Sequence, residues 1–283
     1  SIFYTWNYLV EDYTRLKLTH EVDRLPALSG IAVSASKVIS SEHNTKSPHT
    51  ITYIAGIWST HLPAALFWTC SPTSYRPRCY RAPTFSWASV EGAISYHPPL
   101  IRSRGGYDTY WVCEILGFSS TAKGLDPHGQ VSSGWIEVRG YTGMAVIAHY
   151  PSPERSGATM CVVEQADMLP DGQVGPVRRQ KFQLDIPKLC TAKPAEVEPG
   201  DEVLVLLLEC LKKNGQLRSD HSNQSWSLYN VMALVLQPSK SISDAWERVG
   251  LICDESYNII RQDRDMFYWP DAWFPEKKVV RIV

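Results

Sequence analysis

The sequence predicts an α+β fold in which two or three N-terminal helices precede a mostly antiparallel β-sandwich or open β-barrel. Three observations support this. Apolar residues recur at helical spacing in the first third of the chain, prolines crowd together after about Ser71, and short apolar or alternating segments follow, separated by turn residues. Many short strands between such turns are typical of sandwiches and barrels. We expect a helical segment over residues 1–70, packed on a β-rich domain over residues 71–283.

The helical segment contains three stretches. One face of a first helix is defined by apolar residues at i, i+3, i+4 and i+7, which are Trp6, Leu9, Val10 and Tyr13. Thr5 is its expected N-cap. A second, short helix is expected to begin after Asp23 and to run through about residue 35, since the first helical turn tolerates Pro26. A third is expected over residues 53–67, broken or kinked near Pro63, and the polar residues 40–50 are typical of a loop.

The β-rich domain contains two kinds of strand pattern. Residues 136–139, bracketed by Gly134 and Gly140, alternate between apolar and charged, as in a strand with one buried face. Residues 203–208 are apolar throughout, which favours a strand buried on both faces, although a helix also fits this pattern. Further strands are expected at residues 144–149 (after a turn at residues 142–143), 231–236, 248–252 and 279–283.

Charge and hydropathy restrict the class of protein. The formal net charge is −1, so no overall basic field exists to hold nucleic acid or an anionic membrane. The longest strongly apolar run, residues 203–208, is far shorter than the roughly 20 residues of a membrane-spanning helix. The first residues lack the basic and apolar regions of a signal peptide, and there is no initiator Met. We therefore expect the C-terminal fragment of a longer, cytoplasmic protein.

The seven cysteines are scattered singly, without a C-x-x-C pair. A disulfide framework or a zinc cluster requires tighter, paired spacing, so we expect reduced thiols, no bound metal and no cofactor. Cys210 and Cys253 lie in apolar stretches and are interpreted as small buried hydrophobic residues. The other five are Cys70, Cys79, Cys113, Cys161 and Cys190.

No combination of residues predicts a catalytic, cofactor-binding or metal site. A G-x-S-x-G nucleophile elbow is absent, and the nearby His20, Asp23 and Ser29 are interpreted as the start of a helix rather than a triad. The eight histidines form no H-x-x-x-H pair and no H-E-x-x-H motif. His43 and His49 are interpreted as solvated loop residues. We therefore do not expect an enzyme.

Two basic segments have ordinary structural interpretations. Residues 102–106 (RSRGG) offer two guanidinium groups to an anion but lack the P-loop and Rossmann signatures, which favours a surface turn. Residues 178–181 (RRQK) are interpreted as a solvated charge run. Neither segment therefore predicts a phosphate or nucleotide site.

One segment near the end of the chain combines acidic and aromatic side chains, as a sugar site does. Its carboxylates are Asp263, Asp265 and Asp271, and its aromatic residues are Tyr268, Trp269, Trp273 and Phe274. A loop that wraps those aromatic side chains onto the core explains the pattern equally and is favoured.

Several longer motifs occur in a fixed order along the chain. They are residues 6–14 (WNYLVEDYT), 23–32 (DRLPALSGIA), 53–58 (YIAGIW, followed by Leu62 and Phe67-Trp68) and 80–92 (YRAPTFSWASVEG). Together they resemble the region downstream of the HET domain in filamentous-fungal heterokaryon-incompatibility proteins. Thr84 and Phe85 depart from that family's Y-R-A-P-S-W-S-W-A-S-V-[DE]-G pattern but keep size or aromatic character. Weaker similarities lie at residues 126–134, 245–250 and 279–283.

The resemblance implies a role in fungal non-self recognition and programmed cell death. The signatures of the HET domain itself are absent and would lie upstream of Ser1, so its activity is not carried over. We expect a non-catalytic regulatory or recognition region whose partner is another protein or the upstream HET domain, with no nucleic acid and no membrane. The apolar motif residues are interpreted as core anchors, among them Leu25, Leu28, Trp58, Trp68 and Trp87.

Two other classes of function remain open. A β-module that binds a glycan or another small molecule is suggested by the acidic and aromatic segment 263–274. An enzyme, for example a hydrolase, is the third class, because catalytic residues can meet only in the fold.

Overall fold

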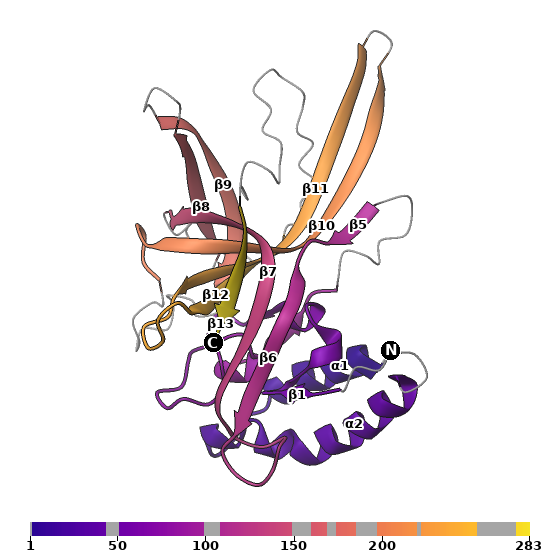
Figure 1. Ribbon diagram of the computed structural model, residues 1–283, viewed down its shortest axis with the longest axis vertical. Coiled ribbons are helices and arrows are strands. Elements are labelled where there is room, and N and C mark those ends of the chain that lie inside the picture. Colours follow the sequence, from indigo (N-terminus) through magenta and orange to yellow (C-terminus); the bar gives the residue numbers. More distant parts are fainter. Residues whose placement is uncertain are drawn as a thin grey trace.

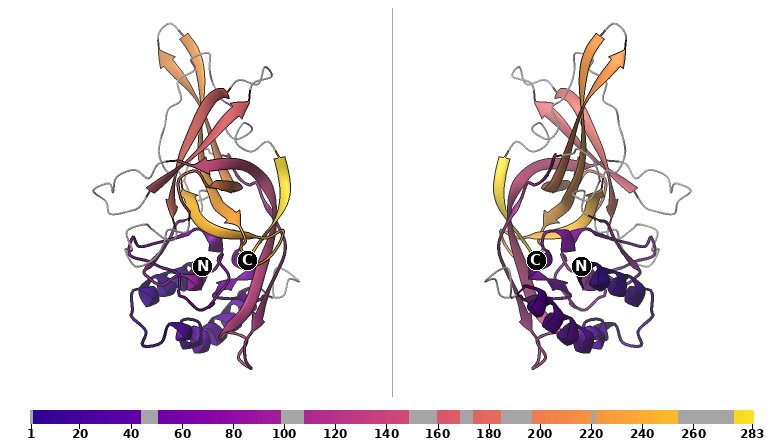
Figure 2. Two further views of the ribbon diagram at one scale, coloured as in Figure 1. Left: turned by 90° about the vertical axis from the view of Figure 1, so that its left-hand side faces the viewer. Right: turned by 90° about the vertical axis from the view of Figure 1, so that its right-hand side faces the viewer.

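The computed structural model describes residues 2–43, 51–98, 108–148, 160–168, 174–184, 197–219, 222–253 and 276–283. Residues 2–98 form a layer of helices, turns and short strands, and this layer lies at one end of a large, mostly antiparallel sheet (Figure 1). The β8–β9 and β10–β11 hairpins extend from the other end of the sheet (Figure 2). The chain therefore has the expected α+β organisation.

Two α-helices occur in the described part of the chain. Helix α1 (Ile2–Thr14) buries an apolar face that includes Trp6 and Val10, as predicted. It begins before Thr5, so the prediction of Thr5 as N-cap was wrong. Two 3₁₀ turns, η1 (Glu21–Asp23) and η2 (Pro26–Leu28), lead into α2 (Ser29–His43). Helix α2 continues past the predicted end because Ile39, which is fully buried, extends its apolar face.

The third predicted helix, over residues 53–67, is wrong. Strands β1 (Tyr53–Ile54) and β2 (Ile57–Trp58) form a hairpin, and the 3₁₀ turns η3 (Ser59–His61) and η4 (Ala64–Leu66) follow. Strand β3 (Trp68–Cys70) then pairs with β4 (Ile94–Tyr96), and η5 (Trp87–Ser89) lies between them in sequence. Most of these side chains are buried. The sequence therefore lacks the alternation of polar and apolar residues that would have distinguished short strands from a helix.

In the described residues, nine strands form the large sheet. They are β5 (Asp108–Trp111), β6 (Glu114–Ala122), β7 (Val131–Ile147), β8 (Met160–Met168), β9 (Val174–Leu184), β10 (Glu202–Ser219), β11 (Ser222–Pro238), β12 (Trp246–Cys253) and β13 (Glu276–Ile282). Their order is β13-β7-β8-β9-β12-β11-β10-β5, with β6 beside β7 and with additional pairings between β13 and β12 and between β7 and β10. Only the β12–β13 pairing is parallel among these strands.

Strand β7 is continuous through residues 142–143, where the sequence predicted a turn. Residues 136–142 pair with β13, whereas residues 142–146 pair with β10, so the strand changes its partner at Thr142 without ending. The predicted strands at residues 203–208, 231–236, 248–252 and 279–283 match β10, β11, β12 and β13.

Two apolar cores lie on opposite faces of the sheet. The first core receives Leu204, Leu206 and Leu208 from β10, and it also contains Trp6, Leu28, Trp58 and Trp87 of the helical layer. The second core receives Val203, Val205 and Leu207 from the same strand. The prediction that residues 203–208 form a strand buried on both faces is therefore confirmed.

Candidate functional site

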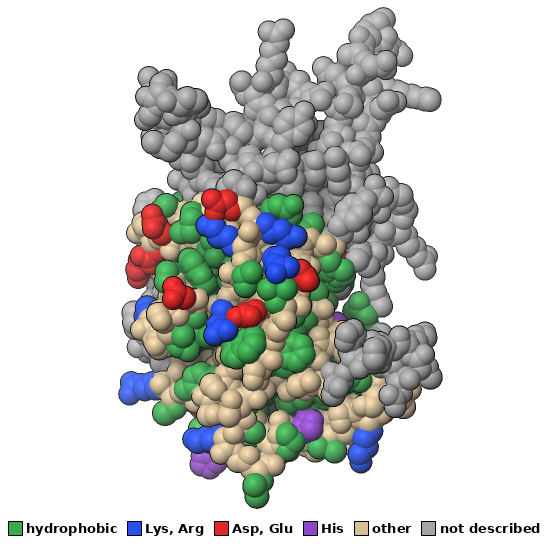
Figure 3. Space-filling model, in the orientation of Figure 1, with side chains coloured by type: hydrophobic (Ala, Val, Ile, Leu, Met, Phe, Trp, Pro, Cys, Tyr) green, Lys and Arg blue, Asp and Glu red, His purple; other side chains and the backbone are tan. Residues whose placement is uncertain are grey.

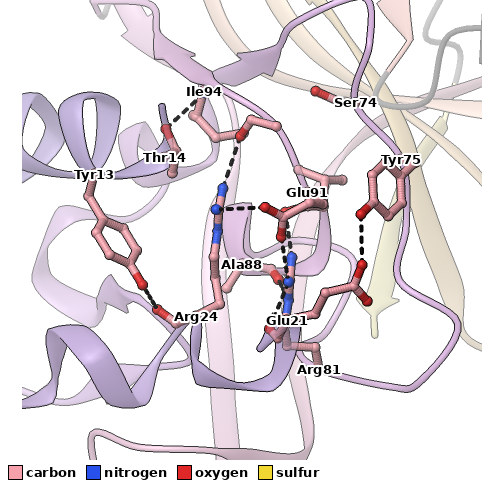
Figure 4. Close-up of polar contacts among 12 residues, drawn as sticks. Tyr13, Thr14, Glu21, Arg24, Ser74, Tyr75, Arg81, Ala88, Glu91 and Ile94 are labelled. Atoms are coloured by element: carbon pink, nitrogen blue, oxygen red, sulfur yellow. Dashed lines mark hydrogen bonds and ion pairs between the residues drawn. The ribbon is translucent and has the colours of Figure 1, made fainter. Parts of the chain in front are cut away.

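Two of the sequence motifs meet at a buried cluster of charges. Arg24 is 0% exposed and Arg81 is 7% exposed, and Glu91 lies between their guanidinium groups (Figure 4). Arg24 Nη1 is 3.2 Å from Glu91 Oε1, and Arg81 Nη1 is 2.8 Å from Glu91 Oε2. Each carboxylate oxygen of Glu91 therefore forms an ion pair with one of the two arginines.

Backbone carbonyl groups accept other donors of the two arginines. Arg24 Nη2 donates to Gly92 O at 2.9 Å, while Arg81 donates to Ala88 O and Val90 O, each at 2.6 Å. Among the described residues, Arg24 Nε has no hydrogen-bond partner. Burial lowers the pKa of Arg24, and the negative charge of Glu91 opposes that effect.

Two tyrosine side chains border the cluster. The Tyr13 hydroxyl donates to Arg24 O at 2.8 Å, and the Arg24 guanidinium lies 5.6 Å from the centre of the Tyr13 ring. The Tyr75 hydroxyl donates to Glu21 Oε1 at 2.7 Å, and this hydrogen bond raises the pKa of Tyr75 to about 12. The cluster thus joins α1, η1 and the loop before β4 (Figure 4).

A second junction lies at the carbonyl oxygen of Gly56. The indole nitrogen of Trp6 donates to it at 3.1 Å, and that of Trp87 donates to it at 2.9 Å. The motifs of residues 6–14, 53–58 and 80–92 therefore converge on one backbone atom.

Arg248 connects the sheet to this layer. Its side chain is fully buried, Nη1 donates to Leu66 O at 2.7 Å, and its guanidinium lies 3.6 Å from the centre of a Trp68 ring. Thr84, one of the two departures from the family pattern, accepts a hydrogen bond from Arg248 N at 2.8 Å. The buried arginines thus hold segments of this chain together.

The structure does not assemble a triad from His20, Asp23 and Ser29. His20 is exposed, the other two residues are partly buried, and no side-chain hydrogen bond joins the three in the described part of the chain. His43 ends α2 rather than lying in a loop, because the helix is longer than predicted. Residues 178–181 form part of β9 and pair with β8.

Several predicted sites lie outside the described residues. They are His49, residues 102–106, and the acidic and aromatic segment with Asp263, Asp265, Asp271, Tyr268, Trp269, Trp273 and Phe274. Within the described ranges, no group of three or more His, Cys, Asp or Glu residues is placed to hold a metal ion. No helix in those ranges is long and apolar enough to cross a membrane.

The fold brings together three residues that sequence reasoning did not connect. Cys253 Sγ lies 3.4 Å from His97 Nδ1, and His97 Nε2 lies 3.0 Å from Thr69 Oγ1. The cysteine and the histidine are separated by 156 positions, so no local spacing could have indicated the pair.

The solvent-exposed side of β6, β7 and β13 carries charges of both signs. Figure 3 shows acidic and basic side chains interspersed on the face of the molecule that faces the viewer. Cross-strand ion pairs account for part of the pattern, with Arg139 and Glu114 at 2.9 Å and Arg281 and Glu137 at 2.6 Å.

Comparison with known proteins did not identify a relative of this chain. No protein-family model, no curated protein and no solved structure matches this chain.

Proposed function

We propose that this chain is the non-catalytic regulatory or recognition region of a heterokaryon-incompatibility protein, acting in the cytoplasm in fungal non-self recognition and programmed cell death. Its partner would be the upstream HET domain or a separate protein. The large sheet would be a β-sandwich or an open β-barrel rather than a flat layer, since the additional β7–β10 and β12–β13 pairings join strands that are not neighbours in the main strand order.

The supporting observation is the position of the motif residues. Arg24, Arg81 and Glu91 form one buried cluster, and Trp6 and Trp87 share one buried acceptor. Buried residues that bond to one another stabilise a fold. The motif series is therefore explained by a shared fold, which would carry a recognition surface. A catalytic role for the same residues would require groups that reach a substrate.

The test begins with the native polypeptide, captured from its source with an antibody against this chain. We expect it to be longer by a domain of roughly 100–200 residues that carries the HET signatures. The separately expressed upstream domain should then bind this chain. A native polypeptide without those signatures, or an upstream domain that does not bind, would contradict the proposal.

The alternative of a glycan-binding β-module rests on residues 263–274, which lie outside the described residues. A glycan array without binding would exclude it.

A further inference from the structure

A thiol, an imidazole and a hydroxyl group meet where the two-stranded β3–β4 sheet reaches the end of β12. Cys253 is the last residue of β12, His97 directly follows β4, and Thr69 is the middle residue of β3. The side chains form a chain of contacts, with 3.4 Å from Sγ to Nδ1 and 3.0 Å from Nε2 to Oγ1.

Paired backbone holds each of the three residues in place. Thr69 is 5% exposed and lies opposite Ser95 in the β3–β4 sheet. His97 N donates to Phe67 O at 2.7 Å, and Cys253, which is half-buried, lies opposite Met232 of β11. Rigid elements therefore set the geometry of the three side chains.

One tautomer of the imidazole suits proton transfer from the thiol. When Nε2–H donates to Thr69 Oγ1, Nδ1 keeps its lone pair toward the thiol and accepts the thiol proton. A thiolate beside an imidazolium is the reactive form of cysteine.

We propose that Cys253 is a nucleophilic thiol that accepts an acyl group from a thioester, with His97 as the base and Thr69 as a positioning residue. The thiol proton moves to Nδ1, and Sγ forms a bond to the acyl carbon. The bond from that carbon to the leaving thiolate breaks, and the imidazolium gives its proton to the leaving thiolate. The products are S-acylated Cys253 and a released thiol, so the reaction modifies this chain rather than turning over a substrate.

A hollow beside His97 favours an apolar acyl group. It has a volume of about 160 Å³ and is lined by Tyr4, Asn7, Tyr8, Glu11, Tyr96 and Pro98 as well as His97. The aromatic walls suit an apolar group, and the Glu11 carboxylate repels an anionic one.

The first experiment measures alkylation of the folded chain by iodoacetamide at pH 7, followed at each cysteine by mass spectrometry. The exposed Cys79 is the internal reference. We expect Cys253 to react about tenfold faster than Cys79, because only about 3% of an ordinary cysteine is thiolate at this pH. His97→Gln should abolish the advantage, Thr69→Val should reduce it, and Thr69→Ser should retain it.

Folding of each variant is checked by thermal unfolding, so that a loss of structure is distinguished from a loss of reactivity. A folded wild-type protein in which Cys253 reacts no faster than Cys79, or a folded His97→Gln variant with an unchanged rate, overturns the proposal.

The second experiment uses a benzoyl thioester as the probe. We expect benzoylation of Cys253 in preference to Cys79, and we expect Tyr8→Glu to reduce the rate of benzoylation relative to the rate of alkylation by iodoacetamide. Tyr8 is 67% exposed, so this substitution is compatible with folding. Equal benzoylation of the two cysteines would overturn the assignment of an acyl donor.

Discussion

At Gly56, a single residue joins three segments of the chain. Its carbonyl oxygen accepts both the Trp6 and Trp87 indoles, and its φ of 100° lies in the region that favours glycine. A Cβ atom here would lie 2.8 Å from Trp87 Nε1. Backbone conformation and packing both exclude a side chain.

Gly56→Ala should therefore lower the free energy of unfolding by about 2 kcal/mol or more. Gly30→Ala is the matched control, because a Cβ at Gly30 meets nothing within 4 Å. In helix α2 that change should be neutral or stabilising by up to about 1 kcal/mol. Chemical denaturation measures both; equal effects would contradict the packing argument.

Glu91 balances two buried cations. Glu91→Gln should destabilise the protein by about 3 kcal/mol, because it leaves Arg24 and Arg81 without their shared counter-charge. The exposed Arg15–Asp12 pair is the control, and Asp12→Asn should change stability by less than about 1 kcal/mol. A Glu91→Gln protein as stable as the control would show that the ion pairs contribute little.

His61 makes stability depend on pH. Its ring stacks on Phe3 at 4.8 Å, and burial lowers the pKa of His61 to about 4. The unfolded chain binds the proton more readily, so this contribution to stability should be fully present above about pH 6.5 and fall toward pH 4. His61→Gln should flatten this part of the stability curve, whereas His20→Gln, at an exposed position, should leave it unchanged. Denaturation midpoints measured across this pH range provide the test.

At the scale of elements, side chains of α1 accept hydrogen bonds from β4 that the backbone of a neighbouring strand would otherwise accept. Thr14 Oγ1 accepts a hydrogen bond from Ile94 N at 3.0 Å, and Glu11 Oε1 accepts one from Tyr96 N at 2.6 Å. Side chains of the helix thus satisfy backbone donors at the edge of the β3–β4 sheet.

Glu11→Ala should destabilise the protein by about 1–3 kcal/mol, because it leaves the Tyr96 amide without its acceptor. Hydrogen exchange should accelerate more at Tyr96 than in β12. Exchange that is unchanged at Tyr96 would contradict this role for the helix.

Some elements of the fold could be predicted from the sequence and others could not, in each case for a physical reason. The run of residues 203–208 was recognisable because an uninterrupted apolar segment of this length suits a strand with two buried faces. The β1–β2 hairpin was missed because its turn places Ala55 at a φ of 46°, a conformation that alanine rarely adopts. Arg24 pairs with Glu91, which lies 67 positions away, and no local pattern indicates a contact across that separation.

At the scale of the whole molecule, the first core crosses the boundary expected at residue 70. It contains Trp6 and Trp58 from one side of that boundary and Leu206 and Leu234 from the other. The helical layer and the sheet should therefore unfold together.

Leu206→Ala should lower the unfolding midpoints measured by circular dichroism and by tryptophan fluorescence to the same extent, at a cost of about 2–5 kcal/mol. Val279→Ala, at a residue that is 54% exposed, is the control and should have a small effect. Midpoints that separate in the Leu206→Ala protein would mean that the two parts unfold independently.

The two apolar interiors have a consequence for insertions and deletions. Consecutive residues of β10 lie in opposite apolar cores. A shift of the β10 register by one residue would therefore move each side chain of residues 203–208 to the other core, without exposing any of these aliphatic groups to water. The leucines of one set and the mostly valine set of the other differ in volume, and the pairing of β10 with β11 shifts between Leu207 and Glu209. Differences in side-chain volume, rather than in polarity, therefore fix the register of the β10–β11 hairpin.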